Sequence, residues 1–200
     1  MSVSSFDYET LTTMVNVKDV IDQDLFRYAG NASLKAFWKC YLTIPGFKYL
    51  YWYRKAQHWQ TRSQRNGLYK PLFVFFELLM RHYGYKYGID IPSSTSIAPG
   101  FYIGHFSGIV ISPRTIIAKN VNISQCVTIG STNMDFATIE EGVYLGPGSK
   151  IVGGVHIGAY AVIGANAVVV KDVPAGITVA GVPAVQISIK DSRRFIQNPV

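Results

Sequence analysis

One histidine in the second half of the chain, His105, has the chemistry of a general base. An imidazole titrates near neutral pH, so it can take the proton of a hydroxyl group as that oxygen attacks an electrophile. Transfer of an acyl group to an alcohol needs such a base, because a neutral hydroxyl is a weak nucleophile. We therefore take His105 as the candidate catalytic residue, and the alternative is a surface histidine without a role.

Two polar residues are candidates for contacting an acceptor or orienting this histidine. Asp90 could bind a polar acceptor or hold the ring of His105, and the alternative is a cap at the start of a regular segment. Gln125 could hydrogen-bond a substrate or orient the base, and the alternative is an ordinary polar surface residue.

Neither metal binding nor thiol chemistry is expected. His105 and His156 are the histidines of the second half of the chain, and their spacing does not suit a zinc site. Cys40 and Cys126 lack zinc-ligand spacing and are too few for a disulfide framework. We expect Cys126 to be a packed thiol, because no base lies near it in the sequence.

A six-residue period positions these candidates and begins after Gly88. This period fits neither an α-helix nor an alternating strand, but it fits a coil of short strands joined by tight corners. Stacked coils bury one continuous apolar core, so the pattern predicts a parallel β-helix. The apolar residues that carry the period are Ile91, Ile97, Ile103, Ile109, Ile111, Ile117, Ile123, Ile129, Ile139, Leu145, Ile151, Ile157, Ile163 and Val169.

The period slips twice, and each slip is an insertion into the coil. Two extra residues fall between Ile109 and Ile111, and four fall between Ile129 and Ile139. We expect the stretch 131–138 to protrude as a loop, and such loops on a solenoid tend to carry function.

The first part of the chain has apolar residues at helical spacing instead. It predicts helices over 17–25, from an N-cap at Ser33, over 47–64 and over 72–83, with a break at Pro45 and a turn at Asn66. We therefore divide the chain into a helical domain (1–88), a β-helix domain (89–187) and a C-terminal tail (188–200). The fold class is mainly β, preceded by a small α-helical domain.

Composition narrows the partners and the compartment. The chain has 200 residues, 48% hydrophobic and 16% charged, with a formal net charge of +7 that favours an anionic partner. Residues 1–10 lack the pattern of a signal peptide, and the apolar run 71–80 is too short to span a bilayer, so we expect a cytoplasmic protein. The basic and aromatic residues before Gly88 predict a solvated basic face, with peripheral contact at the inner membrane face as the alternative. We expect no nucleic-acid partner.

The repeats, taken with the motifs around His105, carry a resemblance to a known family. Residues 90–187 resemble the left-handed parallel β-helix acetyltransferases built from hexapeptide repeats. The segment IGHFSGI (103–109) resembles the active-site region of serine acetyltransferases, and it looks more similar still to their relatives in capsule and exopolysaccharide gene clusters. The ending AGVPA (180–184) resembles the usual close of the helix.

This resemblance implies a mechanism and a set of site residues. In the family three hexads make one coil, which after the first slip puts Gln125 beside His105. The family implies that His105 is the base, that acetyl-CoA is the co-substrate in a direct transfer within a ternary complex, and that a homotrimer holds active sites between its subunits. The motif match assigns CoA binding to Gly130, Pro147, Gly148, Gly164, Ala165 and Lys171. Other cations available for the CoA phosphates are Lys150, Lys190, Arg193 and Arg194.

Two departures from serine acetyltransferases bear on the acceptor. Gly104 stands where those enzymes have Asp, and the loop 131–138 lacks their second His and the Arg before it. We therefore expect the acceptor to be a sugar hydroxyl of a polysaccharide or its precursor. The alternatives are a serine O-acetyltransferase of cysteine biosynthesis and a non-catalytic module that binds CoA or a sugar.

Overall fold

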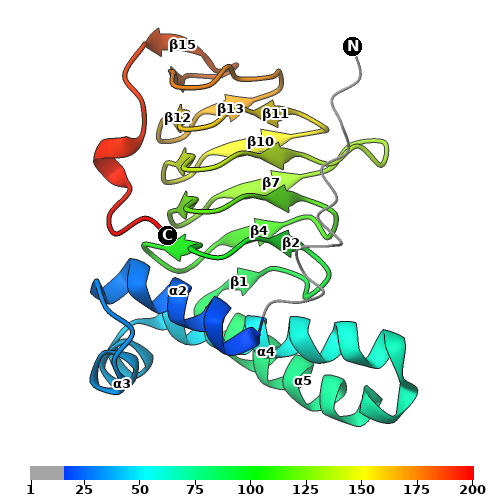
Figure 1. The fold of residues 1–200 in the computed structure, drawn as a ribbon. Helices are drawn as coiled ribbons and strands as arrows, with labels where there is room; N and C mark the ends of the chain where they lie inside the picture. The colour runs from blue at the N-terminus through cyan, green and yellow to red at the C-terminus, as the bar shows by residue number, and fades with distance from the viewer. Residues whose placement is uncertain (1–15) are drawn as a thin grey trace.

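The computed structural model describes residues 16–200 as a group of helices followed by a tall solenoid (Figure 1). The absence of a signal peptide was predicted from residues 1–10, which lie outside the described part. The helices are α2 (Val17–Ala29), α3 (Leu34–Thr43), α4 (Pro45–Arg65), the short 3-10 helix η1 (Gly67–Tyr69) and α5 (Lys70–Tyr87).

The ends of these helices follow from their sequences, and the predicted helices are confirmed. The Ser33 side chain accepts a hydrogen bond from the backbone N–H of Ala36 and so caps α3. Pro45 lies at the start of α4, where its missing N–H has no intrahelical partner to lose. Gly30 and Gly88 end α2 and α5 in the left-handed conformation, which glycine adopts without a steric penalty.

The solenoid consists of three sheets, which we name sheets A, B and C. Sheet A contains β1 (Ile89–Asp90), β4 (Ile109–Ile111), β7 (Thr128–Gly130), β10 (Lys150–Val152) and β13 (Val168–Val169). Sheet B contains β2 (Ser96–Ile97), β5 (Ile116–Ile117), β8 (Thr138–Ile139) and β11 (His156–Ile157). Sheet C contains β3 (Tyr102–Ile103), β6 (Asn122–Ile123), β9 (Tyr144–Leu145), β12 (Val162–Ile163), β14 (Thr178–Ala180) and β15 (Val185–Ser188).

The chain passes from sheet A to B to C and back, so each circuit is one coil of a β-helix (Figure 1). Neighbouring strands pair in parallel, except for the terminal β14–β15 pair. Every residue that carries the six-residue period, from Ile91 to Val169, is buried in one continuous core. The predicted parallel β-helix is therefore confirmed.

The strand register locates the first insertion in the corner that holds His105. Sheet C pairs Ile103 with Ile123, a step of 20 residues, whereas sheet A pairs Ile111 with Ile129, a step of 18. The corner between β3 and β4 is therefore two residues longer than the corner stacked on it. This lengthening separates the His105 backbone from the regular ladder of the sheets.

The second insertion forms the predicted loop between β7 and β8. Thr128 pairs with Lys150, a step of 22 residues, whereas Thr138 pairs with His156, a step of 18. The loop is fixed at its start by a hydrogen bond of 3.0 Å from the Ser131 backbone N–H to the Ser112 side chain.

A buried ion pair attaches the helices to the first coil. Arg54 of α4 contacts Asp24 of α2 through its Nε, at 2.7 Å, and donates to the carbonyl of Ile97 at 2.5 Å. One Asp24 oxygen accepts hydrogen bonds from the backbone N–H groups of Gly100, at 2.8 Å, and Phe101, at 3.2 Å. Burial raises the pKa of Asp24, and the adjacent guanidinium opposes that rise.

Tyrosines complete this attachment. The hydroxyl of Tyr49 donates to the Ile91 carbonyl at 3.0 Å, and that of Tyr53 donates to the Thr95 carbonyl at 2.5 Å. The first coil has no coil beneath it, so its backbone groups need partners other than a strand. Side chains of the helices supply those partners.

The end of the chain runs back along the solenoid as a strap, which we define as residues 191–200 (Figure 1). Ser192 donates from its backbone N–H to the Tyr160 carbonyl at 2.9 Å, and the Phe195 ring stacks on Tyr144 at 4.4 Å. The backbone N–H of Val200 reaches the Asn120 side chain at 2.9 Å. Whether the helices, the β-helix and the tail are separate domains stays a prediction.

None of the helices described over residues 16–200 is both long enough and apolar enough to cross a bilayer.

We predict that Arg54→Ala lowers the stability of the protein by about 3–5 kcal/mol, because it leaves Asp24 buried without its cation. Thermal unfolding should show a Tm lower by roughly 10 °C. The matched control is Arg65→Ala, an exposed arginine at the end of the same helix. Equal Tm values for the two variants would contradict the proposed attachment.

Candidate active site

His105 lies on the lengthened corner between sheet C and sheet A, and its side chain is exposed. Two backbone hydrogen bonds to the next coil fix this corner. Gly104 donates to the Ile123 carbonyl at 2.9 Å, and Cys126 donates to the Ser107 carbonyl at 2.8 Å. The backbone on both sides of His105 is therefore held, while its ring faces solvent and is accessible to a substrate.

The end of α5 supports the same corner from below. The ring of Phe106 contacts the ring of Tyr87 at a centroid distance of 5.6 Å, and Ile109 donates to the Gly88 carbonyl at 3.1 Å. A Cβ atom at Gly88 would lie only 3.3 Å from the Ser107 hydroxyl. The helices therefore help to position the corner that carries the candidate base.

Gln125 lies on the corner one coil above His105. His105 follows Ile103 by two positions, and Gln125 follows Ile123 by two positions. Ile103 and Ile123 are partners in the strand register, as the coil length predicted. Its backbone carbonyl accepts a hydrogen bond of 2.9 Å from Gly148, but its side-chain oxygen is buried and finds no partner within residues 16–200. A buried acceptor without a donor is costly, and a bound molecule could reach this oxygen only if the Gln125 side chain turned outward.

Asp90 lies on β1, at the edge of sheet A that adjoins the His105 corner. It pairs in register with Val110 of β4, and its side chain is exposed. Within the described structure neither Asp90 nor Gln125 hydrogen-bonds the His105 ring. The structure therefore brings the three candidates to one region without forming a preassembled dyad.

The residues assigned to CoA lie on two sides of sheet A. One side is the edge where its strands begin, and the other is the edge where its strands end. Pro147, Gly148 and Ala165 continue the column of corners above Gln125, and the Pro147 carbonyl accepts a hydrogen bond of 2.8 Å from Asn166. Gly164 follows β12 beside this column. Gly130 ends β7 and Lys171 follows β13 at the opposite edge, so one chain does not bring the whole set together.

That opposite edge also carries the protruding loop and a cation that the sequence analysis did not consider. Arg114, in the turn after β4, places its guanidinium carbon 5.3 Å from the centre of the Phe136 ring. The loop itself contains no arginine, but the neighbouring coil brings one to it. Only the register of the coils could have revealed this pair.

The remaining cations lie in different places. Lys150 donates from Nζ to the Cys126 carbonyl at 2.5 Å, close to the His105 corner. Arg193 pairs with Asp191 in the strap and stacks over the Tyr160 ring, at the far edge of sheet C. The expectation that Cys126 is packed is wrong, because its left-handed corner position leaves it exposed.

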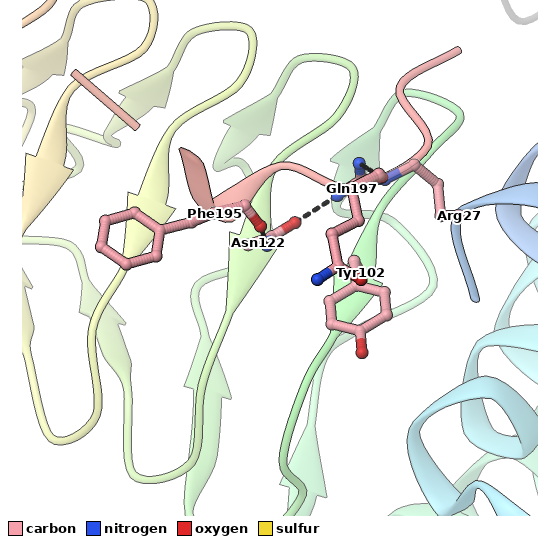
Figure 2. Close-up of a pocket in the computed structure, with 5 residues that line it drawn as sticks. All are labelled: Arg27, Tyr102, Asn122, Phe195 and Gln197. Atoms are coloured by element: carbon pink, nitrogen blue, oxygen red, sulfur yellow. Dashed lines mark hydrogen bonds between the residues drawn. The ribbon is translucent and has the colours of Figure 1, made fainter. Parts of the chain in front are cut away.

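A cavity of about 100 Å³ lies beneath the strap, away from these candidates (Figure 2). It is lined by Arg27, Tyr102, Asn122, Phe195 and Gln197. The Arg27 guanidinium donates to the backbone carbonyls of Gly100 and Gln197 and to the Asn122 side chain. Burial lowers the pKa of Arg27. These contacts make Arg27 the anchor of the strap.

Among residues 16–200, no three His, Cys, Asp or Glu side chains gather as metal ligands would. The hexad core and the exposed corner histidine define the class of hexapeptide-repeat transferases. Residues 136–171 match the bacterial transferase hexapeptide (six repeats) family.

Curated relatives narrow this class. The chain is 34% identical over 160 residues to a serine acetyltransferase of Buchnera aphidicola subsp. Acyrthosiphon pisum, covering 77% of this chain and 55% of that protein. It is 35% identical over 155 residues to the Escherichia coli K12 serine acetyltransferase, covering 76% and 54%. A serine acetyltransferase of Buchnera aphidicola subsp. Schizaphis graminum is 30% identical over 208 residues, covering 92% and 76%. The chain therefore belongs to the serine acetyltransferase family, although it spans about half the length of the first two relatives.

Solved structures agree with this assignment. A serine acetyltransferase in complex with CoA superposes with a TM-score of 0.71 at 29% identity, covering 90% of this chain and 72% of that one. The Neisseria gonorrhoeae serine acetyltransferase in complex with serine gives 0.70 at 26% identity, covering 90% and 73%.

The expectation of a sugar acceptor is wrong. The relatives that match most of the chain are serine acetyltransferases, and their solved structures include complexes with CoA, cysteine and serine. The expectation depended on Gly104 and on the residues inside the loop 131–138. Coil stacking brings Arg114 to that loop from another part of the sequence.

We predict that Gly148→Ala destabilises the column of corners while Gly130→Ala does not. Gly148 has φ +73° and a Cβ there would meet the Asn166 side chain at 2.1 Å, whereas nothing lies within 4 Å of a Cβ at Gly130. The left-handed backbone should cost about 1–2 kcal/mol for alanine. Urea unfolding of both variants measures the difference, and equal midpoints would contradict the described corner.

Proposed function

We propose that this protein transfers the acetyl group of acetyl-CoA to the hydroxyl of serine. The observation that carries the proposal is the exposed His105 on a lengthened, well-supported corner of a chain 34% identical to a serine acetyltransferase. The CoA and serine complexes of the similar structures support the choice of donor and acceptor.

The proposed reaction is a direct transfer in a ternary complex. His105 takes the proton of the serine hydroxyl as that oxygen attacks the thioester carbonyl. The tetrahedral intermediate collapses by breaking the bond from carbon to sulfur. The protonated imidazole returns its proton to the departing CoA sulfur, so O-acetylserine and CoA leave with the histidine neutral. No metal is needed for any step.

Other residues have supporting roles in this proposal. The side chain of Gln125, on the corner above His105, hydrogen-bonds a bound substrate. Asp90 places a negative charge beside the corner, where it orients the imidazole or attracts the ammonium of the acceptor. The small residues Pro147, Gly148, Gly164 and Ala165 leave room for CoA along the column above. The cytoplasm stays the predicted compartment.

The division of the CoA residues between two edges of sheet A supports a trimer with shared sites. One chain cannot place Lys171 beside the column of Pro147 and Ala165, because sheet A lies between them. A neighbouring copy in a cyclic assembly can present its own loop edge to that column.

We predict a homotrimer in solution. Light scattering coupled to size exclusion should give about three times the 22.2 kDa mass of one chain at concentrations used for assays. A monomer that is fully active at the same concentration would contradict shared sites.

We predict that His105→Ala lowers the rate of CoA release with acetyl-CoA and serine by about 10²–10⁴-fold, because general-base catalysis contributes that much. The matched control is His156→Ala, which removes an exposed histidine on sheet B, paired with Glu140. An active His105→Ala variant would overturn the mechanism. A wild-type protein that binds CoA but releases none with serine would favour the non-catalytic module.

A further inference from the structure

Serine differs from other small alcohols by its carboxylate, which calls for a cation in the acceptor site. We infer that Arg114 of a neighbouring subunit binds this carboxylate and so selects an amino acid as acceptor. This inference rests on the proposed function and adds a specificity residue to it.

The first observation is the placement of Arg114. It follows β4 at the edge of sheet A, and its side chain is exposed. Its guanidinium carbon lies 5.3 Å from the centre of the half-buried Phe136 ring, in the protruding loop. A cation over an aromatic face is attracted to it, so Phe136 holds the guanidinium at the loop instead of leaving it mobile in solvent.

The second observation is that the donors of this guanidinium are free within residues 16–200. Across residues 16–200, no carboxylate and no carbonyl accepts a hydrogen bond from Arg114. By contrast, Arg54 pairs with Asp24, Arg81 with Glu77 and Arg193 with Asp191. A guanidinium offers a planar fork of N–H groups that matches a carboxylate in two parallel hydrogen bonds. Arg114 therefore stacks on the loop with its fork available among the described residues.

The nearest alternative is Lys150, which lies closer to His105 within the chain. Its ammonium already donates to the Cys126 carbonyl at 2.5 Å. A lysine also presents a point charge without the planar geometry that fixes an acceptor's orientation. We therefore assign the carboxylate to Arg114.

The placement of the two residues favours a site shared by two subunits. His105 precedes β4 and Arg114 follows it, and the three residues of that strand alone span about 10 Å. The two residues therefore lie at opposite corners of sheet A in one chain. Two copies that place the His105 corner of one beside the loop edge of the next would supply both groups.

The first test compares Arg114→Ala and Arg114→Lys with Lys119→Ala, which removes an exposed cation at the following corner of the same coil. Loss of charge-assisted hydrogen bonds should raise the KM for serine about 10- to 100-fold in Arg114→Ala, and less in Arg114→Lys. The KM for acetyl-CoA should stay within about twofold, because the thioester does not meet this group.

Ethanolamine, an acceptor without the carboxylate, tests whether Arg114 recognises that group. Wild type should strongly prefer serine over ethanolamine, and Arg114→Ala should lose most of that preference by losing serine activity alone. Phe136→Leu should raise the KM for serine less than Arg114→Ala does, because Phe136 acts only by positioning the guanidinium. Phe136→Tyr keeps an aromatic ring and should have a KM for serine near that of wild type. An Arg114→Ala variant with the serine KM and preference of Lys119→Ala would overturn the inference.

Hybrid trimers test the shared site. Subunits carrying His105→Ala and subunits carrying Arg114→Ala, co-expressed with different tags, should recover about a quarter of wild-type activity, since a site needs one intact residue from each of two subunits. Hybrids no more active than the two parents would show that both residues act within one chain. A wild type that uses ethanolamine but never serine would overturn the proposed function itself, whatever the Arg114 variants do.

Discussion

The first coil of the β-helix has no coil beneath it, and the structure depends on how its exposed backbone groups are satisfied. A buried amide or carbonyl without a partner costs as much as a lost hydrogen bond, and a coil presents a row of them. Here Arg54 and Asp24 satisfy carbonyls and N–H groups of this coil, and Tyr28 hydrogen-bonds the backbone of Ile103. The helices are therefore the base on which the stack of coils begins.

The same base determines the position of the candidate active site. The helix α5 ends at Gly88, and the chain enters the first strand directly beneath the corner of His105. The Gly88 carbonyl, and the contact between Tyr87 and Phe106, support a corner that two extra residues have removed from the regular ladder. A longer corner exposes its side chains, and a supported corner keeps them in place. A base that must meet a substrate in a fixed geometry needs both properties.

The sequence predicted the features that depend on local periodicity. The period of six identified the buried residues from Ile91 to Val169, and its second slip located the loop, because every hexad repeats one physical environment. The first slip was misplaced, since the register puts the two extra residues before Ile109 and not between Ile109 and Ile111. The attachment of the helices could not be predicted in this way. Arg54 contacts the Ile97 carbonyl, 43 residues away, and nothing in the pattern of either segment specifies that pairing. The buried side-chain oxygen of Gln125 was equally invisible, since burial of one atom depends on how two coils stack.

The loop 131–138 shows how coil stacking brings together residues that are separate in the sequence. In a β-helix, residues one coil apart are spatial neighbours, so a side chain needed at a loop need not belong to that loop. The core residues fix the backbone of every coil, which leaves corner residues outside the left-handed positions free to change without disturbing the fold. A cation can therefore reach the loop from the coil below, as Arg114 does beside Phe136. The residues of such a site lie close together in space although they belong to different coils, so they are found by comparing neighbouring coils.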